Sequence, residues 1–311
     1  MRMICEYFKQ FLSNCKLKGL LPRSIQNYEE IIQRFINYTG NVEMDRLDID
    51  LINEYIMSLY DRELSKASIG TYLRHLKVFF KFCEEKGYTK FKLSREIKIP
   101  RQPKKLITIF TNQEIQCIFD KVYIENNWIH VRNTFVISIM LDSGLRLSEV
   151  VNLKVGDVNT QKNVIKVTGK GNKERLVPAG KLSISLMNEY LDLISGICTM
   201  KSDDYLLIRD EDYKPITRNA IKLFLHKLSA QLPIDFSAHK LRHNFATNYC
   251  IDEYNRTGSM DIYKLKTLLG HEEIETTMRY MHLANQIIIS NTKSSHLDLI
   301  GIRKSTQNNR I

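Results

Sequence analysis

A short segment with two prolines, about one third of the way along the chain, limits how the chain can fold. Residues 99–105 read Ile-Pro-Arg-Gln-Pro-Lys-Lys. Because proline has no backbone N–H and clashes with the preceding helical turn, this segment cannot continue a regular helix, and its cations favour an extended, solvated conformation. We therefore expect one domain at residues 1–99, a linker at 100–106 and a second domain at 107–311, a division that 311 residues are enough to support.

Apolar residues at helical spacing dominate the first of these domains. They recur every three or four positions in three stretches: Ile25, Tyr28, Ile32 and Phe35; Leu51, Ile52, Tyr55, Ile56 and Leu59; and Ile69, Tyr72, Leu76, Phe79, Phe80 and Cys83. This spacing is typical of helices with one buried face, so the sequence predicts an all-helical domain.

The third stretch also carries a basic stripe. Arg74, Lys77 and Lys81 follow one another at i, i+3 and i+7, which places them along one side of the predicted helix. We interpret the stripe as a DNA-binding surface. Taken alone, it is equally an ordinary solvated helix face, and only the motifs described below favour DNA.

The second domain mixes helices with a predicted β-hairpin. An apolar helix runs through Phe135 and Met140 and ends at a turn over residues 142–144. Strands are expected at 164–168 and 175–177, joined by the glycine- and lysine-rich residues 169–173. The fold class is therefore mainly α, with an all-helical N-terminal domain and an α+β C-terminal domain that holds a small β-hairpin or sheet.

Charge and composition restrict the partners. The chain has 46 Lys and Arg against 35 Asp and Glu, a formal net charge of +11 that favours a polyanion such as nucleic acid, although many proteins of similar charge bind none. Six widely spaced cysteines form no zinc-binding pattern. No apolar run has the length of a membrane span, and the first residues lack the apolar core of a secretory signal, so we expect a cytoplasmic protein without a membrane partner.

Four clusters in the second domain could carry chemistry. They are residues 143–149 (Ser-Gly-Leu-Arg-Leu-Ser-Glu), the hairpin tip with Lys170, residues 239–243 (His-Lys-Leu-Arg-His), and residues 269–271 (Leu-Gly-His) followed by 280–282 (Tyr-Met-His). Taken singly, each has an ordinary structural explanation. These are a helix-surface ion pair, a solvated lysine, a structural histidine and arginine on one helix face, and a half-buried packing tyrosine.

Taken together and in this order, the clusters resemble the tyrosine recombinase family, which includes the lambda-type integrases and the bacterial Xer proteins. That family shows an arginine in a G-L-R-x-S-E segment, a lysine on a β-hairpin, an H-x-L-R-H segment, an L-G-H segment and then a tyrosine. The resemblance spans about residues 111–282, and the helical N-terminal part resembles the family's SAM-like core-binding domain more loosely. It implies a DNA strand-exchange enzyme that cleaves and rejoins specific sites through a 3′-phosphotyrosine at Tyr280.

The resemblance also implies roles for individual residues. The catalytic set is Arg146, Lys170, His239, Arg242, His271 and Tyr280, with Glu149 in support. The two arginines would clamp the scissile phosphate, because guanidinium matches phosphate bidentately and stays charged. Lys170 would protonate the leaving 5′ oxygen, and His239 would take part in proton transfer at Tyr280. No metal and no other cofactor is implied.

The expected partners are double-stranded DNA with a specific recombination site and further recombinase subunits. By resemblance, the assembly is a homo-tetramer, or a hetero-tetramer with a second recombinase. The two-domain layout is Xer-like, but residues 250–264 form a longer stretch than is usual, so resolution of chromosomes or plasmids and integration or excision of a mobile element both stay open. Apolar residues within 284–300 favour a C-terminal helix that docks on a neighbouring protomer, and docking of this helix on its own chain is the alternative.

Two functions of other classes are alternatives to recombination. A type IB topoisomerase would use similar chemistry to relax DNA without needing a defined site. A non-catalytic DNA-binding protein with the same fold would be expected to have lost Tyr280, Arg146 or Arg242, and all three are present.

Overall fold

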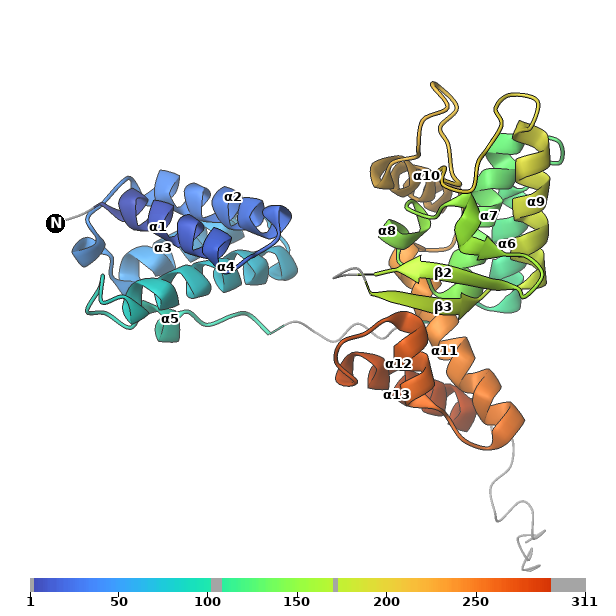
Figure 1. Ribbon diagram of the computed structural model, residues 1–311. Coiled ribbons are helices and arrows are strands. Elements are labelled where there is room, and N and C mark those ends of the chain that lie inside the picture. The colour runs from blue at the N-terminus through green and yellow to red at the C-terminus, as the bar shows by residue number, and fades with distance from the viewer. Residues whose placement is uncertain (1–2, 102–107, 170–172, 292–311) are drawn as a thin grey trace, which may run out of the picture. The chain divides into compact units, whose positions relative to one another are not determined.

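The computed structural model describes residues 3–101, 108–169 and 173–291, and it divides into two compact units, Met1–Lys105 and Leu106–Ile311 (Figure 1). Each unit has a hydrophobic core of its own. Each is described by itself below.

The first unit is all-helical, as the periodicity predicts. Its helices are α1 (Ile4–Leu17), α2 (Pro22–Thr39), the 3-10 turn η1 (Met44–Arg46), α3 (Ile49–Asp61), α4 (Lys66–Glu85) and α5 (Leu93–Glu96). Helices α1, α2 and α4 pack against one another, and α3 packs against α2 and α4. The core is rich in aromatic rings, and Phe35, Phe79 and Phe80 are fully buried. The apolar faces predicted for the three helices therefore pack against one another.

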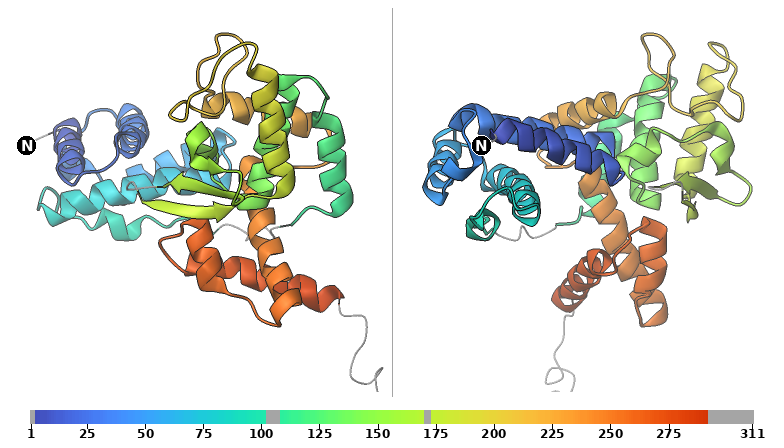
Figure 2. Two further views of the ribbon diagram at one scale, coloured as in Figure 1. Left: turned by 45° about the vertical axis from the view of Figure 1, so that its right-hand side comes forward. Right: turned by 60° about the vertical axis from the view of Figure 1, so that its left-hand side comes forward.

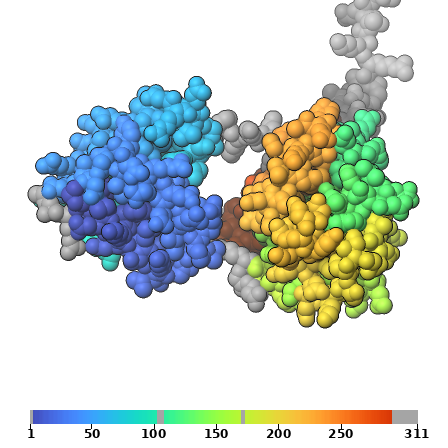
Figure 3. Space-filling view, turned by 90° about the horizontal axis from the view of Figure 1, so that it is seen from above, coloured from blue at the N-terminus to red at the C-terminus, as the bar shows by residue number. Residues whose placement is uncertain are grey.

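The second unit combines helices with one small sheet. It contains α6 (Asn112–Val122), α7 (Trp128–Ser143), α8 (Leu147–Val150), η2 (Val155–Asp157), β1 (Val158–Asn159), β2 (Val164–Thr168), β3 (Glu174–Pro178), α9 (Lys181–Ile194), α10 (Arg218–Gln231), α11 (Ala238–Thr257), α12 (Ile262–Leu269) and α13 (Glu275–Asn291). Figure 2 shows the sheet from two further sides, and Figure 3 shows α10 and the loop before it at the surface of this unit.

The sheet confirms the predicted hairpin and extends it by one strand. Strands β2 and β3 are antiparallel, with Val164 opposite Pro178 and Thr168 opposite Glu174. The added strand, β1, pairs with β2 through only two residues, which is too short for a period of two to be visible in the sequence. Residues 170–172 at the hairpin tip, including the predicted general acid Lys170, lie outside the described residues.

Helix α7 forms the centre of this unit. It packs against α9 and α11, and its residues from Thr134 to Met140 are all buried, so it carries apolar side chains around its whole circumference. The helix ends where Gly144 adopts a left-handed conformation (φ 61°), which turns the chain towards Arg146. This turn is the one predicted over residues 142–144.

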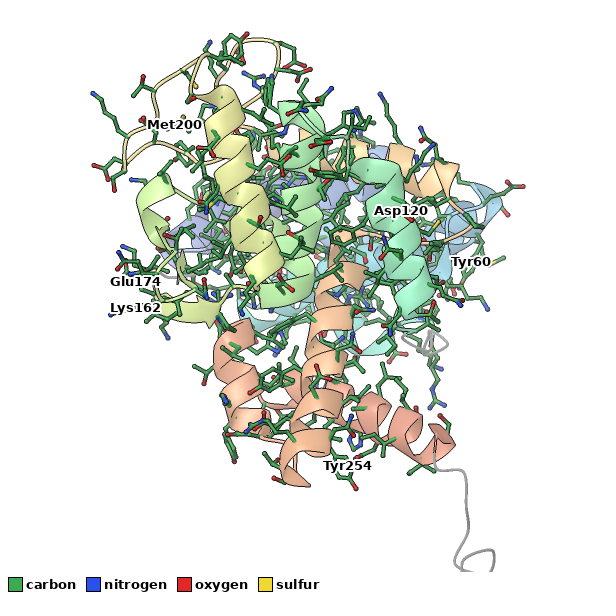
Figure 4. The ribbon with its side chains drawn as sticks, turned by 90° about the vertical axis from the view of Figure 1, so that its right-hand side faces the viewer. Tyr60, Asp120, Lys162, Glu174, Met200 and Tyr254 are labelled. Carbon is green, nitrogen blue, oxygen red and sulfur yellow. The ribbon has the colours of Figure 1, made fainter. Side chains whose placement is uncertain are left out.

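Helices α11, α12 and α13 form a separate small bundle at one side of the sheet (Figures 1 and 2). In Figure 4, the end of α11 that carries the labelled Tyr254 points away from the sheet, whereas Glu174 labels the start of β3. The core of this bundle includes Phe245, Leu269 and Tyr280. The last described helix ends at Asn291, so most of the apolar segment 284–300, with its predicted docking on a neighbour, lies outside the described residues.

Candidate active site

Five of the predicted site residues, including Glu149, and two that were not predicted, Arg175 and His243, meet where the sheet, α8, α11 and the α12–α13 bundle adjoin. Arg146 precedes α8, Arg242 lies in the first turns of α11, His271 follows α12 and Tyr280 lies on α13. Hydrogen bonds among these elements connect residues up to 124 positions apart. The sequence clusters are therefore assembled into one site.

Glu149 is the anionic centre of this site. Its carboxylate accepts two hydrogen bonds from the guanidinium of Arg175, at 3.0 and 2.9 Å, and one from Nη1 of Arg146 at 3.0 Å, and it also accepts one from the backbone N–H of Arg146 at 2.8 Å. Burial raises the pKa of this carboxyl, but the hydrogen bonds from Arg175 and from the Arg146 backbone more than offset it, so the pKa lies below its ordinary value. Glu149 is therefore ionised at neutral pH and fixes the arginines around it.

The guanidinium of Arg242 is held by two backbone carbonyls. Its Nη1 donates to the carbonyl of Gly144 at 2.7 Å, and its Nη2 donates to the carbonyl of Leu269 at 2.7 Å. Burial and the neighbouring Arg146 lower its pKa to about 10, so the guanidinium stays charged at neutral pH. The two carbonyl bonds fix the plane of the guanidinium.

Arg146 is the more accessible of the two predicted phosphate ligands. Its side chain is 37% exposed, and Nη2 donates to the carbonyl of Gly270 at 2.8 Å. Arg146, Arg242 and Arg175 together carry three positive charges against the one carboxylate of Glu149. The site is therefore cationic, and it suits an anionic substrate such as a phosphodiester.

His271 is locked between two partners. Nε2 lies 3.1 Å from Nη2 of Arg242, and Nδ1 lies 2.9 Å from Oγ1 of Thr277. Because an arginine can only donate, Nε2 accepts and Nδ1 carries the hydrogen. Burial and the positive charge of Arg242 lower the pKa of His271 to about 4, which keeps the ring neutral.

Tyr280 is buried at the edge of the arginine cluster, with 1% of its surface exposed. Its hydroxyl lies 2.7 Å from Nδ1 of His243, and its ring stacks on that of His271 with the centroids 6.3 Å apart. Burial raises the pKa of the phenol, whereas the positive charges of Arg279, Arg242 and Arg146 oppose that rise. The hydroxyl is therefore protonated at neutral pH and needs a proton acceptor before it can attack.

His239 lies one helical turn before His243, and the two rings are 3.9 Å apart. Burial and the charges of Arg242 and Arg279 lower the pKa of His239. The structure thus places His243, rather than His239, against the Tyr280 hydroxyl, so the role in proton transfer predicted for His239 stays a prediction.

Two residues of the site were missed by the sequence analysis. His243 was part of a quoted motif but received no role, and its position four residues after His239 was the signal that both rings share a helix face. Arg175 lies on the predicted strand after Lys170, and nothing in a short strand pattern indicates that its side chain reaches Glu149.

The predicted DNA-binding stripe lies in the first unit, on α4. Arg74 and Lys81 are exposed and Lys77 is half-buried. Arg74 donates to Oγ1 of Thr71 at 2.9 Å, and Lys81 lies 3.8 Å from Glu85. These contacts are those of a solvated helix face, and they leave the cations available to a polyanion.

Over residues 3–101, 108–169 and 173–291, no group of three or more His, Cys, Asp or Glu side chains is arranged to hold a metal ion. Within the same residues, no helix combines the length and the apolar character needed to cross a bilayer.

The arrangement contains the groups that a phosphoryl transfer to a protein hydroxyl requires. A tyrosine lies next to a neutral imidazole, and two oriented guanidinium groups lie on the same side of the site. Such groups can activate a nucleophile and stabilise charge on a phosphate.

Comparison with known proteins supports this chemistry. Residues 108–286 match the model of the phage integrase family, and residues 7–90 match the model of the phage integrase N-terminal SAM-like domain. The chain is 30% identical over 283 residues to the tyrosine recombinase XerC of Staphylococcus carnosus, covering 89% of this chain and 93% of that protein. It is 27% identical over 290 residues to the tyrosine recombinase XerD of Staphylococcus haemolyticus, covering 91% and 95%.

Solved structures share the fold at lower identity. The integrase of transposon Tn1549 in complex with a circular intermediate DNA superposes with a TM-score of 0.70 at 16% identity, covering 93% of this chain and 99% of that one. A lambda integrase dimer bound to a core site gives a TM-score of 0.69 at 14% identity, covering 89% and 95%. The XerH recombinase bound to its difH substrate gives 0.66 at 23% identity, covering 86% and 78%.

Proposed function

Because the chain belongs to the phage integrase family and is a Xer-like tyrosine recombinase, we propose that it cuts and rejoins DNA through a 3′-phosphotyrosine formed by Tyr280. Its activity is that of a site-specific, DNA-breaking and rejoining enzyme. The observation that supports Tyr280 as the nucleophile is the position of its hydroxyl, hydrogen-bonded to a neutral histidine beside three arginines.

In this proposal Arg146 and Arg242 bind the non-bridging oxygens of the scissile phosphate. Both guanidinium groups are held by backbone carbonyls, at Gly270 for Arg146 and at Gly144 and Leu269 for Arg242, so little reorganisation is needed when charge develops. Glu149 supports the two arginines. His271, fixed by Arg242 and Thr277, supplies a further neutral group beside the phosphate.

Strand cleavage forms one bond to phosphorus and breaks another. Oη of Tyr280 attacks the phosphorus, the bond from phosphorus to the 5′ oxygen breaks, and the bond energy is kept in the phosphotyrosine for rejoining. We propose that Lys170 protonates the departing 5′ oxygen and that the reverse steps seal the partner strand. His239 is proposed as a further ligand of the phosphate.

We propose that the partner is double-stranded DNA that carries a specific recombination site. The integrase and recombinase structures in complex with a core site, difH or a circular intermediate DNA share this fold. Residues 1–99 would act as the core-binding domain through Arg74, Lys77 and Lys81, residues 100–106 would serve as the linker, and residues 107–311 would form the catalytic domain. The active assembly would be a tetramer, homomeric or with a second recombinase, in the cytoplasm, where its DNA lies.

Covalent trapping tests the nucleophile. The purified protein is incubated with nicked duplexes that it selects from fragments of its own genome, and protein–DNA adducts are scored on denaturing gels. We expect an adduct with the wild type and none with Tyr280→Phe. The matched control is Tyr263→Phe, since Tyr263 on α12 is 72% exposed. An adduct that persists in Tyr280→Phe would place the nucleophile elsewhere, and relaxation of plasmids that lack any selected site would indicate a topoisomerase instead.

A further inference from the structure

The hydroxyl proton of Tyr280 needs an acceptor, and the geometry of the site restricts the choice. Arginines only donate, so Arg146, Arg242 and Arg279 cannot take it. Both ring nitrogens of His271 are already used, Nε2 by Arg242 and Nδ1 by Thr277. Glu149 is engaged by Arg175 and Arg146.

The ring of His239 lies against that of His243, with the centroids 3.9 Å apart, and it is a ring nitrogen of His243 that contacts the hydroxyl. Nδ1 of His243 lies 2.7 Å from Oη of Tyr280, so the phenol donates to Nδ1 when the ring hydrogen of the neutral imidazole is on Nε2. Only 8% of the His243 side chain is exposed and only 1% of Tyr280, so the contact lies in a site with little access for a water that could replace it. The bond connects two helices, α11 and α13, and it fixes the phenol relative to the arginines.

We propose that His243 is a catalytic residue that orients the Tyr280 hydroxyl and accepts its proton during DNA cleavage. This inference rests on the function proposed above. As Oη bonds to phosphorus and the 5′ oxygen leaves, the proton moves from Oη to Nδ1 of His243. In the rejoining step, the 5′ hydroxyl attacks phosphorus and Nδ1 returns the proton to the released phenol.

The surroundings keep His243 ready to accept. The charged and titratable groups that act on it are His239 and Arg242 on its own helix and Arg279 and Tyr280 on α13. Burial, the neighbouring His239 and the positive charges of Arg279 and Arg242 lower the pKa of His243 to about 4. The ring is therefore unprotonated across the neutral range, and the arriving phosphate partly compensates the nearby positive charge, which favours the protonated ring as cleavage proceeds.

The test separates orientation from proton acceptance. In His243→Asn, the amide oxygen occupies a position close to that of Nδ1 and can accept the hydrogen bond, but it cannot take the proton. His243→Gln is a second variant without a proton acceptor, in case the first does not fold. The matched control is His226→Asn on α10, where His226 is exposed and remote from the site residues.

The substrate is a duplex selected by the protein, with sulfur in place of the bridging 5′ oxygen at the scissile phosphate. A thiolate leaves without a proton, so Lys170 is no longer needed and the rate reports on the nucleophile alone. Adduct formation is followed in single turnovers between pH 6 and pH 9, and binding of the same duplex is measured for every variant.

For the wild type and for His226→Asn, we expect a rate that is flat over this range. For His243→Asn we expect unchanged DNA binding and a rate about 100-fold lower at pH 7, which is the usual contribution of a general base. That rate should rise about tenfold per pH unit, because the phenolate must then form unaided.

A His243→Asn rate within threefold of the wild type overturns the inference, and so does a slower rate that stays flat with pH, because that reports only lost orientation. Tyr280-dependent adducts in the wild type would leave the proposed function standing in both cases. If the wild type forms no adduct on any duplex that it selects, the proposed function fails, and the inference fails with it.

Discussion

Arg175 on strand β3 forms a bidentate ion pair with Glu149 on the short helix α8, with hydrogen bonds of 3.0 and 2.9 Å. The third donor of the same guanidinium, Nε, reaches the carbonyl of Leu268 at 2.8 Å. One side chain thus connects the hairpin, the carboxylate of Glu149 and the end of α12. This arrangement gives Arg175 a positioning role, because it acts through Glu149 and the α12 end.

Replacing Arg175 by lysine should destabilise the protein although the charge is kept. An ammonium group cannot make the paired bonds to Glu149 and also reach Leu268, so buried acceptors lose partners. We expect the free energy of unfolding in urea to fall by about 2 kcal/mol. Arg256→Lys is the matched control, because Arg256 pairs with Glu253 at 2.8 Å on the surface. Equal effects of the two substitutions would contradict the positioning role.

Arg242→Lys should affect cleavage more than DNA binding. The guanidinium of Arg242 is aligned by the carbonyls of Gly144 and Leu269, and an ammonium cannot make both bonds while it also faces a phosphate. Loss of one preorganised donor to a developing oxyanion slows a reaction by about 100- to 1000-fold. Single-turnover adduct formation should fall by that factor, whereas affinity for the duplex should change by less than about tenfold. A larger loss of affinity than of cleavage rate would argue against the proposed role.

Stability should decrease on mild acidification because two histidines, the buried His243 and the half-buried His271, resist protonation. The pKa values of His243 and His271 are lowered to about 4 in the folded protein, against about 6.5 in an unfolded chain. Between these values the unfolded state binds more protons, so the stability present above pH 6.5 is lost progressively as the pH falls towards 4.

From pH 7 to pH 5, we expect the free energy of unfolding to drop by on the order of 1 kcal/mol or more, measured by urea titration. The pKa of Glu149 is lowered in the folded protein, so protonation of this carboxylate reduces the free energy of unfolding only at a lower pH than this window. In His271→Gln the drop should be smaller, since one titrating group is gone. A urea midpoint that does not change between pH 7 and pH 5 would show that these rings are not held neutral.

The basic stripe on α4 should contribute to DNA affinity through phosphate contacts. Each contact releases counterions and adds about 0.9 to the slope of log affinity against log salt. Replacing Arg74, Lys77 and Lys81 together by alanine should lower that slope by about 2 to 3 and weaken binding at low salt. A control triple with the same change in charge is provided by Lys9 and Lys16 on α1 and Lys18 directly after it, all of which are exposed. If both triples weaken binding equally, net charge explains the effect and the stripe has no special role.

Local sequence patterns predicted the elements, whereas the site depended on motif resemblance. The hairpin could be predicted because alternating strands flank a loop of glycine and lysine, and α7 could be predicted from its apolar run and terminal glycine. The proximity of Arg146 and Tyr280, which are 134 positions apart in the sequence, follows from no local rule, and only the order of the family's motifs indicated it.

The two contacts that sequence reasoning missed are both tertiary. The bond from His243 to Tyr280 depends on how α13 packs on α11, and the pair of Arg175 and Glu149 depends on how the sheet meets α8. Neither helical spacing nor strand alternation contains that information. Strand β1 was missed because its two residues are too few to show the alternation of apolar and polar side chains that indicates a strand.

Gly144 shows how closely Arg242, a proposed phosphate ligand, depends on the end of α7. It has a left-handed φ of 61°, its carbonyl accepts from Arg242, and a Cβ built on it would overlap the ring of Phe245. Gly144→Ala should therefore cost both the left-handed backbone penalty of about 1–2 kcal/mol and the displacement of a buried ring. Gly258→Ala has the backbone penalty alone, because Gly258 has a φ of 76° with no atom within 4 Å of the added Cβ.

We expect urea titration to give a loss of about 1 kcal/mol for Gly258→Ala and at least about twice that for Gly144→Ala. Because a moved Gly144 carbonyl also releases Arg242, Gly144→Ala should slow adduct formation as well, while Gly258→Ala should not. Phe245→Leu in the Gly144→Ala background gives the alanine space and should restore part of the cleavage rate. If the two glycine substitutions prove equally mild, the close packing of Phe245 on the arginine-bearing turn does not constrain the site.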